Sequence, residues 1–345
     1  MASRREEITI VGGGIAGLSL GIALRLREVP VRLLEASHYP RHRVCGEFIS
    51  GVKPETLQKL GVEEILSDSE SLVSTGWYDD RGSVLEARLP VPARGISRYR
   101  LDQRMAEKIV ELGGVVEEGT RYRTEGSDDA GVVLSTGRPV KKGSEWMGLK
   151  AHYTALPLVQ DLEMHLGKGG YLGMSGVENG RVNVCGLFRR RSDLKVSRET
   201  ALQEYVRAVG LNDLADRLEK GGQDPESCVG VSAFTFGYQL EKESPYLRLG
   251  DRGAIIPPFT GNGMSMAFES AEMALDSLVR YSEGKVEWDT MQSAFDQALR
   301  KRFRRRLGVS RLFHPVMANR VGRTFIRGAM KTRCLPFEWL FQKTR

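Results

Sequence analysis

The sequence predicts an α/β fold, in which a Rossmann-type nucleotide-binding domain carries an inserted β-sheet domain and is followed by a helical C-terminal segment. Three observations predict this architecture: a strand, a glycine-rich turn and a helix at the start of the chain; a second such unit near residue 250; and a β-rich pattern with turn signals between them. With 345 residues, 41% of them hydrophobic, the chain can bury more than one core.

The first unit opens the chain. Residues 7–11 (EITIV) predict a short buried strand, and residues 15–27 predict a helix with a broad apolar face. Between them, Gly12, Gly14 and Gly17 match G-x-G-x-x-G. The first glycine permits a tight turn, the second lets a pyrophosphate approach the backbone, and the third lets the helix pack on its strand. Because a helix N-terminus offers free N–H groups and a positive dipole end, this turn predicts a phosphate-binding site.

The second predicted strand, residues 29–36, ends in an acidic residue. Glu35 stands where a carboxylate accepts hydrogen bonds from both ribose hydroxyls of an adenine nucleotide, and a bond of this kind is worth roughly 1.5–3 kcal/mol. The same charge would repel a ribose 2′-phosphate, so tightly held NADP is not expected here. These residues alone do not distinguish NAD from FAD.

The second unit, residues 246–279, favours the longer cofactor. A predicted buried strand ends at Gly250-Asp251, and a proline-rich turn with Gly261 and Gly263 leads into a long helix. This is a second helix N-terminus preceded by glycines, where an anionic or electron-rich group can rest. A dinucleotide held both by the first turn and near Asp251 must be long and must run through the domain.

Together with two further segments, these units resemble the FAD-dependent aromatic-hydroxylase superfamily (group A flavoprotein monooxygenases), and within it the geranylgeranyl reductase-like branch. Residues 39–50 (YPRHRVCGEFIS) are similar to that branch's P-R-x-K-x-C-G-G segment, with Arg43 in place of Lys and Glu47 in place of the second glycine. Residues 96–114 are similar to R-x-x-L-D-x-x-L followed by a helix. There Arg98 would approach the cofactor, whereas Asp102 is expected to begin the helix, since helices favour an acid at their start.

The resemblance implies that the chain binds FAD. The first glycine loop would hold the ADP pyrophosphate and Asp251 the ribityl hydroxyls. The Gly261–Met264 backbone would lie at the N1/O2 region of the isoalloxazine, where a helix dipole stabilises the negative charge of reduced flavin. The implied cofactor-binding residues are Gly12, Gly14, Ile15, Ala16, Gly17, Glu35, Ala36, Arg43, Cys45, Gly46, Arg98, Asp251, Pro258, Gly261, Asn262, Gly263 and Met264.

The electron donor stays open at this point. The superfamily usually shows a D-G segment, used for both flavin and pyridine nucleotide, after the helix that follows Arg98. This chain has Thr136-Gly137-Arg138 in its place. NAD(P)H is expected as the transient reductant, but the segment that would receive it is altered.

The predicted domains interleave along the chain. The FAD-binding domain is expected to comprise residues 1–70, 95–145 and 246–285. The substrate-binding β-sheet domain is expected to comprise residues 71–94 and 146–245, with a hairpin around Asp79–Gly82, a second at Asn179-Gly180 and helices within 199–219. A basic helical segment, 286–345, follows.

Catalytic residues are only weakly indicated. The polar candidates in the inserted sheet are Trp146, Lys150, His152 and Tyr153. His152 could deliver a proton near neutral pH, although a half-exposed strand histidine is the favoured interpretation. Cys45 is either a reactive thiol or, more commonly for cysteine, a buried and inert one, and His38 and His42 are expected at the surface. The four cysteines lie far apart, and no Cys/His cluster has zinc spacing, so no metal is expected.

The favoured function is that of an FAD-dependent oxidoreductase acting on a hydrophobic, isoprenoid- or polyketide-like metabolite. It would reduce a carbon–carbon double bond or hydroxylate through a flavin C4a-hydroperoxide. No W-x-W-x-I-P segment typical of flavin-dependent halogenases is present. The alternatives are an NAD-binding dehydrogenase and a non-enzymatic, nucleotide-binding protein of the membrane surface.

Positive charge is concentrated at the C-terminus. From Arg300 onward the chain has 14 Lys or Arg and one acid, Glu338, whereas the net charge of the whole chain is +7, so the remainder is acidic. Residues 288–307 predict an amphipathic helix that ends in a basic cluster. The segment either packs on the acidic body, the favoured interpretation, or contacts an anionic membrane surface; nucleic acid is not an expected partner. With no signal peptide and no long apolar run, a cytoplasmic protein is expected, and the membrane interpretation of the basic segment would place it at the inner face of the membrane. The oligomeric state is not indicated.

Overall fold

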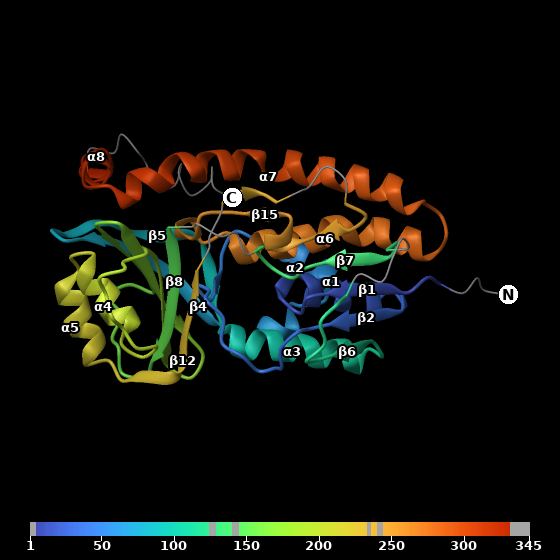
Figure 1. The fold of residues 1–345 in the computed structure, drawn as a ribbon, viewed down its shortest axis with the longest axis horizontal. Helices are drawn as coiled ribbons and strands as arrows, with labels where there is room; N and C mark the ends of the chain where they lie inside the picture. Colours follow the sequence, from blue (N-terminus) through green and yellow to red (C-terminus); the bar gives the residue numbers. More distant parts are fainter. Residues whose placement is uncertain (1–4, 124–128, 140–144, 233–235, 240–243, 332–345) are drawn as a thin grey trace.

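The computed structural model describes residues 5–123, 129–139, 145–232, 236–239 and 244–331. Its strands form a five-stranded sheet, an eight-stranded sheet and a small two-stranded sheet. The two larger sheets occupy opposite halves of an elongated molecule, and a long C-terminal helix runs along both (Figure 1). The predicted α/β class is confirmed.

The five-stranded sheet is parallel and has the order β14-β7-β1-β2-β6. Its strands are β1 (Ile8–Val11), β2 (Val31–Leu34), β6 (Val115–Glu117), β7 (Val132–Leu134) and β14 (Leu247–Arg248). Helix α1 (Ile15–Arg25) packs against both α3 (Arg98–Glu111) and α6 (Gly263–Ser282). All three helices contribute buried residues to one core with the sheet, so strands from both ends of the sequence meet in one Rossmann-type unit.

The eight-stranded sheet has the order β12-β8-β11-β10-β9-β4-β5-β3. Its strands are β3 (Phe48–Ile49), β4 (Glu70–Asp79), β5 (Gly82–Gly95), β8 (Trp146–Tyr153), β9 (Leu162–Gly167), β10 (Gly170–Val177), β11 (Arg181–Arg189) and β12 (Gln223–Ser232). All pairs are antiparallel except β4 with β9. Both predicted hairpins are confirmed, and at the second one Asn179 and Gly180 have positive φ angles of 62° and 66°.

The two faces of this sheet are covered by different elements. One face is covered by helices α4 (Ala201–Ala208) and α5 (Asn212–Glu219), which fall within the predicted 199–219. Alternate residues of β8 pack against these two helices. The other face packs on the C-terminal helices α7 (Trp288–Ala318) and α8 (Arg320–Lys331). Short elements complete the described chain: α2 (Pro54–Leu60), η1 (Glu64–Leu66), β13 (Gly237–Tyr238), η2 (Gly250–Arg252), β15 (Ala254–Ile255) and η3 (Pro258–Thr260).

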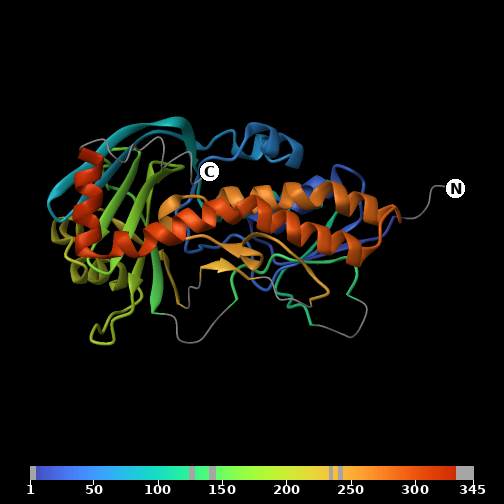
Figure 2. The same cartoon turned by 90° about the horizontal axis from the view of Figure 1, so that it is seen from above.

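Helix α7 is longer than the predicted 288–307. It continues through Pro315 to Ala318 because buried side chains recur along one face within and beyond the basic cluster, namely Phe303, Leu307, Ser310, His314 and Met317. In the view from above, α7 lies alongside α6 before it passes over the larger sheet (Figure 2).

Part of the basic segment faces acids of the body, as the favoured interpretation predicts. Arg302 and Arg306 of α7 pair with Glu269 of α6 at 2.5 and 2.6 Å. Arg327 of α8 donates through Nε to Asp79 at 3.0 Å. The end of the predicted segment, residues 332–345, lies outside the described residues.

Candidate functional site

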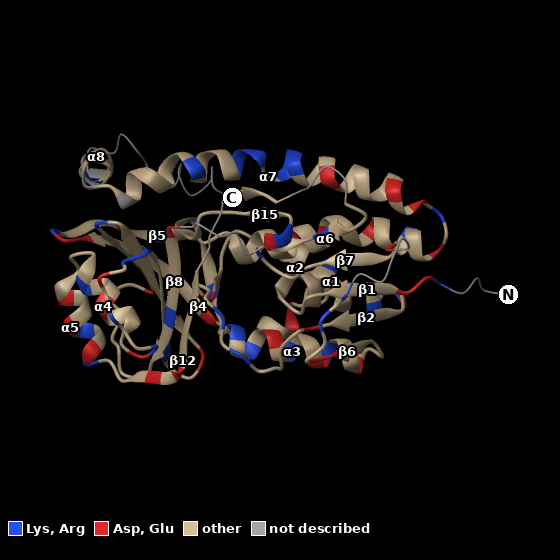
Figure 3. Cartoon of the chain, in the orientation of Figure 1, with Lys and Arg blue, Asp and Glu red and all other residues tan. Residues whose placement is uncertain are grey.

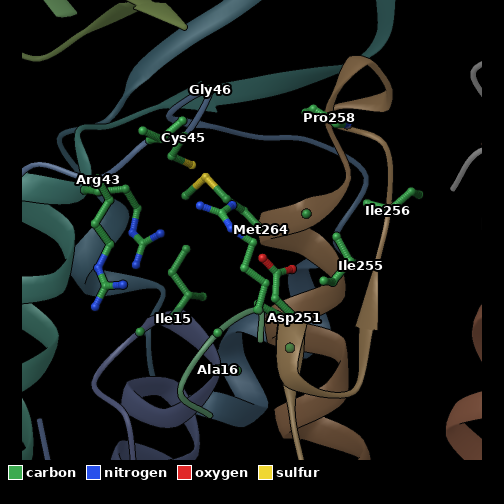
Figure 4. A pocket seen from close by; sticks show the side chains of 18 of the residues that line it. Ile15, Ala16, Arg43, Cys45, Gly46, Asp251, Ile255, Ile256, Pro258 and Met264 are labelled. Carbon is green, nitrogen blue, oxygen red and sulfur yellow. The ribbon is translucent and has the colours of Figure 1, made fainter. Parts of the chain in front are cut away.

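A pocket opens beyond the carboxyl ends of β1, β7 and β14, beside β3 of the larger sheet (Figure 4). Its walls come from the start of α1, the segment that precedes β3, the start of α3, the segment after β7 and the turn between β14 and α6. The following residues predicted from the sequence line it: Gly14, Ile15, Ala16, Arg43, Cys45, Gly46, Arg98, Asp251, Pro258, Gly261, Gly263 and Met264.

A second hollow adjoins the first, because Arg43 and Ser135 line both. The predicted residues Gly12, Glu35 and Ala36 line this second hollow. Two of the predicted residues line neither: Gly17 faces β1, and Asn262 is fully buried at the start of α6.

The glycine loop has the geometry that a phosphate cradle requires. Gly12 has a φ of 105°, and a Cβ there would lie 2.6 Å from the carbonyl carbon of Ser135. A Cβ on Gly17 would lie 2.3 Å from the carbonyl oxygen of Gly12. At Gly14, by contrast, the nearest atom to an added Cβ would be on Arg98, 3.8 Å away. Gly12 and Gly17 therefore serve close packing, and Gly14 leaves the backbone open toward the pocket.

Glu35 is a fixed acceptor at the edge of the second hollow. Its carboxylate accepts from the N–H of Gly13 at 2.7 Å and from the N–H of Ser37 at 2.9 Å. Arg41 pairs with it at 2.7 Å, and the residue is 5% exposed. The acid that the sequence predicts to hold a ribose is thus bonded to the glycine loop itself. Arg41, which sequence reasoning missed, carries positive charge into the same hollow.

Asp251 lies on the opposite wall of the first pocket and points into it (Figure 4). Burial raises the pKa of its carboxyl, and the nearby positive charges of Arg138 and Arg98 oppose that shift. Arg138 belongs to the segment that replaces the expected D-G pair, and it also lines the pocket. Burial lowers the pKa of its guanidinium.

The predicted role of Asp102 at the start of a helix is wrong. Helix α3 begins at Arg98, and its N-cap is Ser97, whose hydroxyl accepts from the N–H of Arg100 at 3.1 Å. Asp102 lies one turn further on, fully buried, and accepts two hydrogen bonds of 2.7 Å from the Arg98 guanidinium. This bidentate pair fixes the arginine beside the pocket.

Cys45 lines the pocket as a thiol. Burial, with the negative charge of Glu47, raises the pKa of Cys45, so the reactive thiolate is disfavoured. Figure 4 shows the side chains of Cys45 and Met264 directed into the space between the walls.

The interpretation of His152 as half-exposed is wrong. The residue is 1% exposed, and its Nε2 lies 2.5 Å from a carboxylate oxygen of Glu47. Lys150, two residues earlier on β8, is also 1% exposed and lies 3.3 Å from the other oxygen. Because successive strand residues face opposite sides of a sheet, Tyr153 points away and packs under α4 and α5.

Two further residues depart from expectation. Glu47 lines the pocket but was not among the site residues predicted from the sequence. The feature that could have identified it is a charged residue at a position where the motif has glycine. His42 was expected at the surface but is only half-exposed, with Nδ1 3.0 Å from the Lys150 ammonium. His38 is exposed, as predicted.

The chain was compared with known proteins by sequence and by structure. No protein-family model matches the chain. Squalene epoxidase 6 of Arabidopsis thaliana is 30% identical over 155 residues, 41% of this chain and 29% of the relative, so the chain spans less than a third of that relative's length. Menaquinone reductase of Mycolicibacterium smegmatis is 23% identical over 355 residues, 89% of this chain and 83% of the relative.

The similarity to solved structures covers nearly the whole chain. Klebsiella pneumoniae HpxO complexed with FAD and uric acid has a TM-score of 0.75, at 17% identity over 100% of this chain and 96% of that one. Pseudomonas aeruginosa PqsL, a probable FAD-dependent monooxygenase, has a TM-score of 0.72, at 15% identity over 93% of this chain and 99% of that one. The chain has the fold of the FAD-dependent monooxygenases. The Rossmann-type architecture predicted from the sequence is confirmed.

Proposed function

We propose that the chain is an FAD-dependent oxidoreductase that acts on a hydrophobic metabolite. The observation that carries the proposal is that Asp251 and the Gly14–Ala16 backbone line one pocket, which continues into the hollow beside Glu35. A long dinucleotide that bonds to both acids must pass the start of α1, whose N–H groups favour a diphosphate. An ordinary NAD site needs no acid at position 251.

The residues fit FAD in charge as well as in shape. Arg43 lines both hollows, and Arg98 and Arg138 line the first, which supplies positive charge along the course of a diphosphate. The flavin, when bound, would supply the hydride or oxygen chemistry of the reaction. The described protein residues would bind it, orient it and exclude water.

An apolar substrate is favoured by the surroundings of the pocket. Pro258 lines the pocket, and the next residue, Phe259, belongs to a buried cluster on the inner face of the larger sheet. That cluster includes Trp77, Tyr171 and Leu187, each at most 8% exposed. Two relatives are named for acting on squalene and on menaquinone, which supports an isoprenoid-like metabolite.

The first experiment is a visible absorption spectrum of the purified protein, followed by titration of the flavin-free protein with FAD and with NAD. Flavin bands and FAD binding would support the proposal. A colourless protein that binds NAD and not FAD would reject it in favour of a dehydrogenase.

The second experiment separates the two flavin chemistries. NADH or NADPH is added to the holoprotein without oxygen, with menaquinone and squalene as probe substrates. Reduction of a carbon–carbon double bond under these conditions would support a reductase. Turnover only in the presence of oxygen would support hydroxylation through a C4a-hydroperoxide. A protein that binds FAD but converts neither probe, with or without oxygen, would favour the non-enzymatic alternative.

We further propose peripheral contact with an anionic membrane. Several basic residues of α7 are exposed, and Figure 3 shows positive charge gathered along its middle; the exposed ones are Arg300, Lys301, Arg302, Arg304, Arg305 and Arg311. Beyond them Leu312, Val321 and Phe325 are about 70% exposed or more. Charge followed by exposed apolar side chains is typical of interfacial helices. Among the residues that the structure describes, no helix has the length and hydropathy needed to cross a bilayer.

A further inference from the structure

The segment Cys45–Glu47 is held from one side by a row of polar residues on the larger sheet. Asn183 of β11 donates through Nδ2 to the carbonyl oxygen of Cys45 at 3.0 Å. Ser175 of β10 donates to the carbonyl oxygen of Gly46 at 2.9 Å. Ser175 and Asn183 stand directly opposite each other across the two strands, so two successive carbonyl groups are turned toward the sheet.

The planarity of the peptide bond then fixes the N–H groups. In a trans peptide the C=O of one residue and the N–H of the next point in opposite directions. Since the carbonyls of Cys45 and Gly46 face the sheet, the N–H groups of Gly46 and Glu47 face away from it. The N–H of Glu47 donates to Sγ of Cys45 at 3.5 Å, and that side chain lines the pocket.

The backbone of Glu47 adopts an uncommon conformation. Glu47 has a φ of 55°, in the left-handed region, whereas Gly46 lies outside that region. A non-glycine residue with this φ is uncommon and costs free energy, so its presence beside a pocket needs a compensating interaction.

The carboxylate of Glu47 supplies that interaction. One oxygen accepts from the N–H of Arg98, at the start of α3, at 3.0 Å and lies 3.3 Å from Nζ of Lys150. The other lies 2.5 Å from Nε2 of His152. Burial opposes the charge of this fully buried side chain, but Lys150 and His152 hold the pKa of Glu47 below its ordinary value. The side chain is therefore an ionised anchor between two parts of the fold.

We propose that Glu47 is a positioning residue: its buried carboxylate holds the Cys45–Glu47 segment so that the N–H of Gly46 faces the pocket as a hydrogen-bond donor for an electron-rich oxygen or ring nitrogen of the flavin, while the N–H of Glu47 holds the Cys45 thiol beside it. The inference rests on the proposed function, because it concerns the same pocket. A fixed donor stabilises negative charge that develops on its acceptor. The N–H of Gly46 thus favours the reduced, negatively charged state of the cofactor.

Glu47→Gly tests this directly, because glycine adopts the same φ without strain while the carboxylate anchor is lost. The FAD dissociation constant is expected to rise about tenfold, and the visible band of the bound flavin is expected to shift. Ser175→Ala removes only the bond to the Gly46 carbonyl and leaves the charges in place, so it should lower the reduction potential of the bound flavin. It also serves as the test if Glu47→Gly does not fold.

Glu178→Gln is the matched control. Glu178 is a buried carboxylate at the same end of α3, where it accepts from the N–H of Ser97 at 2.8 Å, and it does not line the pocket. This variant should keep the wild-type affinity and potential. The inference is overturned if Glu47→Gly binds FAD with unchanged affinity, if Ser175→Ala leaves the potential unchanged, or if Glu178→Gln weakens FAD binding as much as Glu47→Gly does. A wild-type protein that binds no FAD would instead reject the proposed function.

Discussion

Gly250 and Ala16 lie far apart in the sequence and meet beside the pocket: a Cβ added to Gly250 would lie 3.1 Å from the Cβ of Ala16. This contact brings η2, which carries Asp251, against the first turn of α1. The strands that precede these elements, β14 and β1, are separated only by β7 in the sheet. The position of Asp251 opposite the glycine loop is therefore a consequence of strand order.

Asp251→Ala is expected to reduce FAD affinity about tenfold or more, because a hydrogen bond to a charged acceptor is worth roughly 1.5–3 kcal/mol. Fluorescence titration of the flavin-free protein measures the change. Asp276→Ala is a suitable control, since Asp276 lies on α6 but is exposed and paired with Lys59. Equal losses in the two variants would show that Asp251 has no direct role in binding.

Alanine at Gly14 and at Gly17 should have opposite consequences. At Gly14 the added Cβ faces the pocket, so folding should be retained while FAD binding is weakened. At Gly17 the Cβ would collide with the carbonyl oxygen of Gly12, so the melting temperature should fall by several degrees even without cofactor. Thermal unfolding of the flavin-free proteins, together with FAD titration, separates the two effects; similar behaviour of both variants would contradict the assignment.

The parts of the site that the sequence predicted are those set by local rules. The spacing of Gly12, Gly14 and Gly17 fixes a turn between a strand and a helix, and Asp251 follows a strand directly. Such features depend on neighbours in the chain, and for this reason Asp251 was found at the pocket where the motif places it.

The contacts of Glu47 could not be predicted in this way. Its partners Lys150 and His152 lie about a hundred residues away on β8, and only the pairing of β8 within the larger sheet brings them to the pocket. The alternation of hydrophobic residues placed His152 on a strand. It could not show that the side of the strand that carries His152 and Lys150 is buried. The length of α7 was missed for a related reason, since the basic cluster and Pro315 obscured an apolar face that only the sheet beneath it explains.

A buried ion cluster away from the pocket should make stability depend on pH. Burial opposes ionisation of Glu163, but hydrogen bonds from His165 and Arg217 outweigh it and lower the pKa of Glu163 to about 2. The folded-state pKa thus lies below the unfolded value of roughly 4.3. The carboxylate therefore stabilises the fold above about pH 4.3, and this contribution is lost as the pH falls toward 2.

Glu163→Gln should accordingly destabilise the protein by about 3 kcal/mol at pH 7, and the difference from wild type should shrink as the pH falls from 4 to 3. Chemical denaturation across this range measures it. Glu226→Gln, at an exposed position, should show no such dependence. A constant difference between Glu163→Gln and wild type at all pH values would mean that the carboxylate is not ionised in the fold.

The last prediction concerns membrane binding by the exposed face of α7 and α8. Arg304→Glu with Arg305→Glu reverses two exposed charges without touching the pairs that Arg302, Arg306 and Arg327 form with the body. Since each basic residue near an anionic bilayer is worth about 1 kcal/mol, binding to phosphatidylglycerol vesicles should weaken more than tenfold, while FAD binding and unfolding stay as in the wild type. Phe325→Ser should weaken vesicle binding with less dependence on salt, because it removes apolar contact rather than charge. The membrane proposal would be rejected if wild-type protein sediments no better with phosphatidylglycerol vesicles than with phosphatidylcholine vesicles. The basic residues of α7 would then act only through their ion pairs with the body of the protein.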